Sequence, residues 1–223
     1  MITGSNEVLS KNSARDIAIK NLAYVEGRMN GTITSLRTKF PRFDNNLMDG
    51  IEKNSIMTIS APSGGGKSTL AKCIIDSISE YNPDVLMNIY NFNFELTTNQ
   101  TASRTIVTEA DISLRELYSA DEALTPEKFT LLKKYYKKLA ERDNYFFIDV
   151  PSDPATIVNS MWNYYIKECK PNGKMIVTCI DHTLLLKDKT GKGDKHKIDE
   201  LMNLLIAFKK NIDADGGDSL TIV

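Results

Sequence analysis

The feature that most constrains this chain is the segment Ala61–Ser68, which reads Ala-Pro-Ser-Gly-Gly-Gly-Lys-Ser. It follows a strand-like stretch, Ile56–Ser60, and leads into a helical pattern from about Gly66 to Glu80. A glycine-rich turn between a strand and a helix, closed by Gly-Lys-Ser, is the Walker A pattern that cradles phosphate groups. The sequence therefore predicts a phosphate-binding loop at this position.

Three consecutive glycines, Gly64, Gly65 and Gly66, suit this loop to its ligand. They allow the backbone to wrap closely around phosphate oxygens in conformations that a Cβ atom would obstruct, so that successive N–H groups point inward. Ala61 stands where the motif has its first glycine, and it keeps a small side chain at the exit of the strand. We expect this departure to leave phosphate binding intact.

Lys67 and Ser68 supply the polar side chains of the loop. The phosphates would lie at the positive end of the following helix, where Lys67 reaches the β and γ oxygens and the Ser68 hydroxyl ligates Mg²⁺. These roles predict ATP and Mg²⁺ as cofactors, with Thr69 as a weaker metal candidate. The predicted nucleotide-binding residues are Ser63, Gly64, Gly65, Gly66, Lys67, Ser68 and Thr69.

Two carboxylates at predicted strand ends indicate which reaction the loop serves. Glu95 follows the apolar run Val85–Phe94, and Asp181 ends the run Met175–Ile180. Ligands of open α/β sheets bind beyond the carboxyl ends of the strands. We therefore expect Glu95 to orient and deprotonate an attacking water, and Asp181 to hold Mg²⁺ through water.

Other residues near these strand ends are weaker candidates. Asp149 also ends a strand-like stretch, and Glu95 itself has an alternative interpretation as a residue at the start of a helix. His182, directly after Asp181, is a candidate sensor of the γ-phosphate, although a lone histidine is more often structural. Arg104 is a further candidate site residue.

Strand-like and helix-like stretches alternate along the chain. This order predicts an α/β fold with a mostly parallel central sheet flanked by helices, preceded by an N-terminal helix. The predicted domains are an N-terminal helical segment at 1–31 and an ATPase domain at 32–223. The expected strands are Ile56–Ser60, Val85–Tyr90, Tyr145–Asp149, Lys174–Ile180 and Leu220–Val223. The expected helices are Asn12–Met29, Gly66–Glu80, Ala102–Val107, Leu114–Tyr118, Pro126–Arg142, Ala155–Cys169 and His196–Ile212.

The formal net charge of −1 means that any contact with nucleic acid must come from a local basic patch. The segment Lys187–Lys197 has five lysines and two glycines, which predicts a mobile loop. Lys189, Lys192 and Lys195 are candidate contacts to DNA phosphates, and a solvated surface turn is the alternative.

Cysteine usage and the N-terminus bear on location. The chain has three cysteines without the spacing of a zinc site or a disulfide framework. The first residues lack a signal-peptide pattern, and no apolar run approaches the roughly 20 residues of a membrane helix. These features predict a cytoplasmic protein without a membrane contact.

Several of these segments resemble the motor domain of DnaB-type replicative helicases, a RecA-like ATPase, in the same order along the chain. Thr34–Gly50 is similar to the segment that enters the family's first core strand, and Asn93–Leu96 is similar to its Ser-Leu-Glu-Met segment, whose glutamate is catalytic. Ala102–Arg104 resembles the helix that follows, and Ile180–Leu185 resembles the Walker B segment. The Asp-His pair in that segment resembles phage helicase-primases and favours a phage origin.

The resemblance implies a homo-hexamer that translocates on single-stranded DNA and unwinds duplex, with primase and a helicase loader as further partners. The helix within Ser13–Gly31 resembles the family's linker helix, which packs on the adjacent subunit; a helix packed on its own domain is the alternative. In the family, the strand that corresponds to Leu220–Val223 continues into further DNA-contacting loops and an arginine finger. This sequence contains none of these parts, so we expect a truncated or degenerate relative. The finger would come from a neighbouring subunit.

Three other functions remain open from the sequence. The first is a RecA-like ATPase without helicase activity, such as a loader, recombination mediator or switch protein. The second, more distant, is a small-molecule phosphotransferase, which would need an acceptor pocket and a basic lid. The third is a structural protein that binds ATP without hydrolysing it.

Overall fold

The computed structural model describes residues 11–223 except 63, 120–123, 189–190 and 192. By its internal contacts the chain separates into two compact units, one ending at Ser35 and the other comprising Leu36–Val223. The domain boundary that the sequence suggested at residue 31 stays a prediction.

The first unit contains one long helix, α1 (Ala14–Met29), which begins at Ser13 because that side chain accepts a hydrogen bond from the Asp16 N–H. The chain then turns back, and the Ile33 N–H donates to the Gly27 carbonyl at 3.0 Å. A Cβ atom at Gly27 would lie 2.6 Å from the end of the Ile33 side chain, so a larger residue there would force that side chain to move. Much of the helix's apolar surface is exposed, namely Ile17, Ile19, Leu22, Val25 and Met29.

The second unit is built on a five-stranded parallel sheet in the order β1-β5-β4-β2-β3. The strands are β1 (Ser55–Met57), β2 (Met87–Asn93), β3 (Tyr145–Ile148), β4 (Met175–Asp181) and β5 (Ser219–Ile222). Each of the four pairings is parallel, so the carboxyl ends of the strands share one edge of the sheet. Asn93 lies opposite Asp181 in the register between β2 and β4, which places the ends of these two strands side by side.

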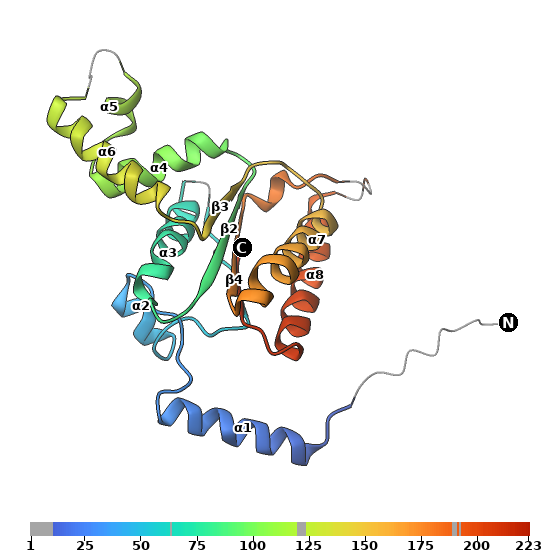
Figure 1. The fold of residues 1–223 in the computed structure, drawn as a ribbon. Helices are drawn as coiled ribbons and strands as arrows, with labels where there is room; N and C mark the ends of the chain where they lie inside the picture. The colour runs from blue at the N-terminus through green and yellow to red at the C-terminus, as the bar shows by residue number, and fades with distance from the viewer. Residues whose placement is uncertain (1–10, 63, 120–123, 189–190, 192) are drawn as a thin grey trace. The chain divides into compact units, whose positions relative to one another are not determined.

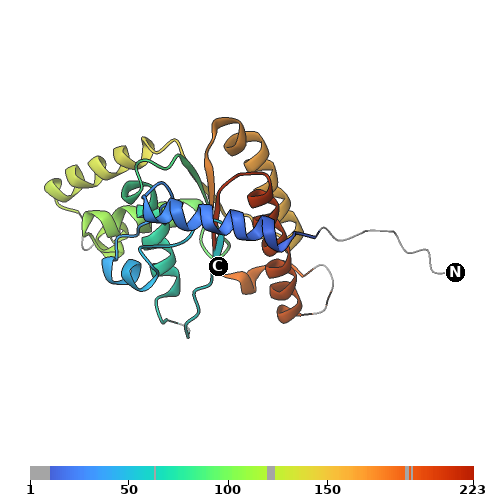
Figure 2. The same ribbon diagram turned by 90° about the horizontal axis from the view of Figure 1, so that it is seen from below.

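Helices cover both faces of this sheet (Figures 1 and 2). One face packs against α7 (Pro154–Tyr164) and α8 (Asp194–Ala214), and the other packs against α3 (Lys67–Tyr81). Successive side chains of a strand point to opposite faces, and accordingly Ile176 belongs to the first core and Val177 to the second. The predicted α/β class with a parallel sheet between helices is confirmed.

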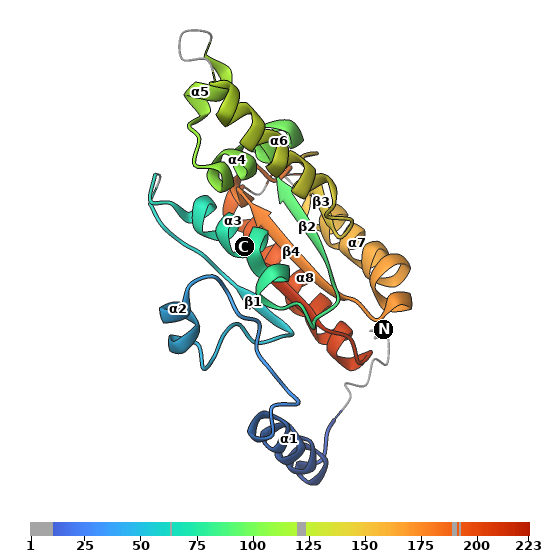
Figure 3. The ribbon, with the colours of Figure 1, turned by 60° about the vertical axis from the view of Figure 1, so that its left-hand side comes forward.

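A smaller helical layer extends beyond α3, as Figure 3 shows. It consists of α4 (Thr98–Ala110), α5 (Leu114–Tyr118) and α6 (Pro126–Ala140). Its own apolar core joins α4 to α6 through Ile106, Val107, Ala110, Ile112 and Leu132. This layer positions α4, which follows directly after the end of β2.

Some elements differ from the prediction. Helix α2 (Pro41–Asn46) was not expected, and α4 begins four residues earlier than predicted because Thr97 and Gln100 form a capping box. The predicted mobile loop Lys187–Lys197 is wrong at its end, since α8 begins at Asp194 and Lys197 is buried.

Candidate functional site

The glycine-rich loop joins β1 to α3, and its glycines are required for two different reasons. Gly64 and Gly66 have φ angles of 76° and 83°, in the left-handed region that side chains disfavour. Gly65 is restricted by space, because a Cβ atom there would lie 2.9 Å from the Ala61 Cβ and 3.0 Å from the Pro62 carbonyl oxygen. Ala61, the departure from the Walker A pattern, is therefore in the position that packs against Gly65. Ser63 lies outside the described residues.

Gly66 is the N-terminal cap of α3, so Lys67, Ser68 and Thr69 form its first turn. The free N–H groups of this turn, together with the helix dipole, favour an anion at this end of the helix. Lys67 and Ser68 are partly buried, and Thr69 is exposed. The loop and the helix end thus have the arrangement predicted for binding the phosphates of a nucleotide.

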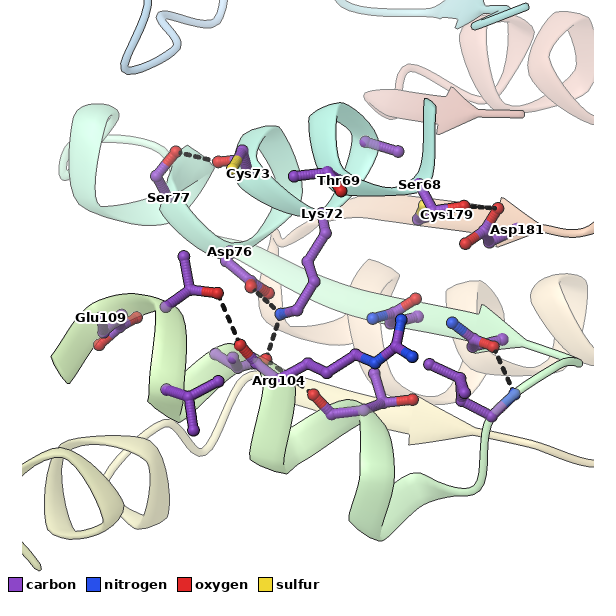
Figure 4. A pocket seen from close by; sticks show the side chains of 18 of the residues that line it. Ser68, Thr69, Lys72, Cys73, Asp76, Ser77, Arg104, Glu109, Cys179 and Asp181 are labelled. Atoms are coloured by element: carbon purple, nitrogen blue, oxygen red, sulfur yellow. Dashed lines mark hydrogen bonds and ion pairs between the residues drawn. The ribbon is translucent and has the colours of Figure 1, made fainter. Parts of the chain in front are cut away.

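The Ser68 hydroxyl donates a hydrogen bond to the Asp181 carboxylate at 3.1 Å (Figure 4). Asp181 ends β4, and its side chain is largely buried. Two side-chain oxygens from different elements therefore lie together beside the glycine-rich loop.

Glu95 lies two residues beyond the end of β2 and lines the same cavity as Ser68 and Asp181. Asn93 ends that strand with a turn, because its side-chain oxygen accepts hydrogen bonds from the N–H groups of Glu95 (3.2 Å) and Leu96 (2.9 Å). The Glu95 side chain is 53% exposed, and its carboxylate contacts the imidazole Nε2 of His182.

His182 brings these groups into one cluster. Its Nε2 lies 3.3 Å from the Ser68 Oγ and 3.7 Å from the Asp181 Oδ2, besides its contact with Glu95. Its backbone has a left-handed conformation, with φ 60° and ψ 54°, and its N–H donates to the Asp181 Oδ1 at 2.9 Å. Of the residues predicted for the site, Ser68, Glu95, Asp181 and His182 thus meet at one edge of the sheet.

Asp149, the weaker carboxylate candidate, has a different partner. Its Oδ2 accepts a hydrogen bond from the Thr98 N–H at 2.7 Å, at the start of α4. Hydrogen bonds from Thr98 hold the pKa of the Asp149 carboxyl below its ordinary value. This engagement favours Glu95 over Asp149 as the carboxylate available to a ligand.

A cavity of about 560 Å³ opens beside this cluster and extends between α3 and α4 (Figure 4). Ser68, Glu95, Asp181 and His182 all contribute to its lining. Arg104 is exposed on α4 and extends into the same space. The structure therefore brings Arg104 to the cavity, though not into the hydrogen-bonded cluster.

A polar network that was not predicted from the sequence forms the floor of this cavity. Lys72 contacts Asp76 on its own helix, α3, and Thr105 on α4. The Tyr145 hydroxyl donates to Asp76 at 2.6 Å. Asn91 of β2 in turn donates to the Tyr145 hydroxyl at 3.1 Å. Burial and the Asp76 charge raise the pKa of Tyr145 well above its ordinary value. The spacing of Lys72 and Asp76 by four residues on one helix was the available signal.

The predicted DNA-contacting lysines are only partly described. Lys195 is exposed in the first turn of α8, whereas Lys189 and Lys192 lie outside the described residues. Asp188 organises the turn before α8, since its carboxylate accepts hydrogen bonds from the N–H groups of Gly191 and Gly193, both at 2.8 Å.

Lys197, counted in the sequence as part of that basic loop, has a structural contact instead. Its ammonium donates to the carbonyl oxygens of Leu184 at 3.1 Å and Leu186 at 2.8 Å, and pairs with Asp194 at 2.8 Å. It therefore fixes the segment that follows His182 against the start of α8.

The donor chemistry of the site fits Mg²⁺. Within the described residues no group of three His, Cys, Asp or Glu side chains could hold a metal ion. Mg²⁺ usually keeps several waters and takes one or two protein oxygens beside the phosphates. The Ser68 hydroxyl suits direct ligation, and the Asp181 carboxylate beside it suits a hydrogen bond to a metal-bound water. Among the described residues, no helix has the length and apolar character needed to cross a membrane. The cytoplasmic location stays a prediction.

Residues 35–214 match the model of a protein family described as the DnaB-like helicase C terminal domain. One solved structure, described as an ATPase domain, is 19% identical, with a TM-score of 0.74, over 95% of this chain and 71% of that one. A DnaB-like replicative helicase, whose description also mentions its interactions with primase, is 18% identical with a TM-score of 0.71. That match covers 96% of this chain and 48% of the other, so the present chain spans about half of that helicase.

Comparison with curated protein sequences finds no significant match. The structural matches nevertheless agree with the predicted RecA-like arrangement of the sheet and helices. The phage origin stays a prediction.

Proposed function

Because the chain belongs to the DnaB-like helicase C-terminal domain family, we propose that it is the ATP-hydrolysing motor domain of a replicative DNA helicase. The observation that carries the proposal is the meeting of Ser68, Asp181 and Glu95 beside a glycine-rich helix start. This combination supports a phosphate site, a Mg²⁺ held by Ser68 directly and by Asp181 through water, and a carboxylate in reach of an attacking water molecule.

Binding begins at the loop between Ala61 and Ser68. The left-handed conformations at Gly64 and Gly66 let the backbone follow the phosphate chain, and Lys67 offsets its negative charge. Ser68 and Asp181 would hold Mg²⁺, which when bound neutralises charge on the phosphate oxygens. The cavity beside these residues gives room for the terminal phosphate and the attacking water.

Glu95 supports hydrolysis by orienting a water and accepting its proton as it attacks the γ-phosphate. Its carboxylate is half exposed and follows a strand whose end is fixed by the Asn93 turn. Asp149 is excluded from this role in our proposal because its carboxylate is engaged by the start of α4.

The proposed motor activity also depends on contacts outside this cluster, between subunits and with DNA. We propose that ATP lies between subunits of a homo-hexamer, with the exposed apolar surface of α1 packed on a neighbouring copy and an arginine supplied in trans. Single-stranded DNA would contact Lys189, Lys192 and Lys195. Primase and a helicase loader are proposed partners.

The test is ATP turnover of the chain and of Glu95→Gln, with and without single-stranded DNA, with the oligomeric mass measured in the same buffer. DNA-stimulated turnover that Glu95→Gln abolishes and that follows ring assembly supports the proposal. An arginine finger contributes about 10³–10⁵ in turnover, so we expect a monomer to be slow. Turnover that is indifferent to DNA supports instead a RecA-like ATPase without helicase activity, and brisk turnover by a monomer contradicts the ring.

A further inference from the structure

We propose that His182 is a positioning residue: its imidazole holds the Glu95 carboxylate beside the metal-binding hydroxyl of Ser68. This inference rests on the proposed function, and it assigns His182 a role toward the catalytic carboxylate in place of direct sensing of the γ-phosphate.

Glu95 needs such an anchor because its backbone is fixed while its side chain is not. The Asn93 side chain accepts hydrogen bonds from the Glu95 and Leu96 N–H groups, and these bonds fix the position of the Glu95 backbone. The side chain is 53% exposed, and within the described part of the chain its carboxylate has His182 as its side-chain partner. A half-exposed glutamate with several rotatable bonds would otherwise sample many positions.

The direction of the hydrogen bonds follows from the chemistry of the groups. An ionised carboxylate only accepts, so the Nε2 of His182 must donate to Glu95. The Ser68 hydroxyl donates its own proton to Asp181 at 3.1 Å. The 3.3 Å approach between Ser68 Oγ and His182 Nε2 is therefore secondary, and Glu95 is the principal partner of the imidazole.

The backbone at His182 aims the side chain at this partner. Side chains alternate between the two faces of a strand, so a continued β4 would direct residue 182 away from the side that Asp181 occupies. The left-handed conformation at His182 interrupts that alternation immediately after the strand. The conformation is held by the hydrogen bond from the His182 N–H to Asp181 and, further along, by Lys197 on the carbonyls of Leu184 and Leu186.

The kinetic test compares His182→Asn with His182→Gln. Asparagine tolerates the left-handed conformation but is too short to reach Glu95, whereas the glutamine amide can still donate to it. Misplacing a reacting group can cost about 10²-fold in rate, so we expect His182→Asn to lower kcat by about 10- to 100-fold. We expect KM for ATP and the ratio of ATP to ADP affinity to stay within about twofold, and His182→Gln to restore much of kcat.

A second measurement needs no turnover. The chain has two histidines, His182 and His196, so a ¹⁵N-histidine spectrum resolves both rings. We expect Glu95→Gln to shift the Nε2 resonance of His182 and to leave His196 unchanged, at one fixed pH.

Three results would overturn the proposal: an unshifted His182 resonance in Glu95→Gln, an unchanged kcat in folded His182→Asn, or a loss of discrimination between ATP and ADP, which would indicate contact with the γ-phosphate. The spectrum also separates this proposal from the proposed function, since it reports the contact even in a chain that hydrolyses no ATP. Conversely, turnover abolished by Glu95→Gln but untouched by His182→Asn would leave the ATPase intact and remove the positioning role.

Discussion

The Ser68 hydroxyl lies 3.1 Å from the Asp181 carboxylate, although 113 residues separate them in the chain. The parallel sheet explains this contact. Ser68 belongs to the helix that follows β1, Asp181 ends β4, and all strands of the sheet end at the same edge. The contact supports the Mg²⁺ site that we propose for these two residues, and it leads to a first prediction.

Asp181→Asn keeps the shape of the side chain and removes its charge. We expect the Mg²⁺ concentration for half-maximal turnover to rise by about tenfold or more, because a neutral amide attracts the cation and its bound water less strongly than a carboxylate does. A Mg²⁺ titration of turnover at saturating ATP measures the change. If the Mg²⁺ dependence were that of the unmodified chain, Asp181 would not hold the metal.

Gly65→Ala should weaken nucleotide binding for a steric reason. The added Cβ would lie 2.9 Å from the Ala61 Cβ and 3.0 Å from the Pro62 carbonyl oxygen, so the loop must shift. We expect a loss of nucleotide affinity of about tenfold, or about 1.4 kcal/mol, measured by equilibrium titration. Adding Ala61→Gly removes one of the two contacts and should restore part of the affinity; no restoration would show that the Pro62 carbonyl alone sets the limit.

The sequence predicted the parts of this site that depend on general rules. The glycine spacing identified the loop, and the sharing of one sheet edge by parallel strand ends placed Glu95 and Asp181 near it. The alternation of strands and helices was sufficient for the fold class, since it reflects burial of both faces of the sheet.

The missed features depend on local conformation that no periodicity encodes. The left-handed backbone at His182 decides where that imidazole points, and histidine itself does not predict it. Lys197 was grouped with solvated lysines by composition, yet its ammonium is buried against two carbonyl oxygens. The polar network on the floor of the cavity, which includes Lys72 and Asn91, depends on which helix packs over which strand.

Asp149→Asn separates stability from catalysis. Because the folded pKa of Asp149 is lowered, its carboxylate stabilises the fold above the ordinary pKa of 3.8, and this contribution is lost as the pH falls below that value. We expect Asp149→Asn to lower the Tm at pH 7, with a difference that shrinks toward acidic pH. Turnover of the folded variant should stay within about threefold, in contrast to Glu95→Gln. An inactive but stable Asp149→Asn would make Asp149 the catalytic carboxylate.

Lys197→Met tests the buried ammonium. Methionine preserves much of the apolar stem, but the carbonyl oxygens of Leu184 and Leu186 lose their donor. An unsatisfied buried polar group costs about 1–3 kcal/mol, so we expect the free energy of unfolding to fall by about that amount. Lys195→Met, on the exposed side of the same helix turn, is the matched control and should change it by less than about 0.5 kcal/mol. Equal effects of the two substitutions would contradict a structural role for Lys197.

The last prediction concerns the lysines proposed to contact DNA. Replacing Lys189, Lys192 and Lys195 by Ala together removes three positive charges from the segment that runs from Asp181 into the first turn of α8. Each phosphate contact on a single strand contributes about 0.7 to the slope of log affinity against log salt concentration, so the triple variant should flatten that slope by up to about 2.

The control removes the same charge elsewhere. Lys133, Lys134 and Lys137 are exposed on α6, and replacing them by Ala changes the net charge of the chain equally. If the lysines after β4 bind DNA phosphates locally, only the first variant should lose affinity and slope, as measured by fluorescence anisotropy with a single-stranded oligonucleotide at several salt concentrations. Equal losses in both variants would show that the effect comes from net charge, and no loss in either would place the DNA on another surface of the protein.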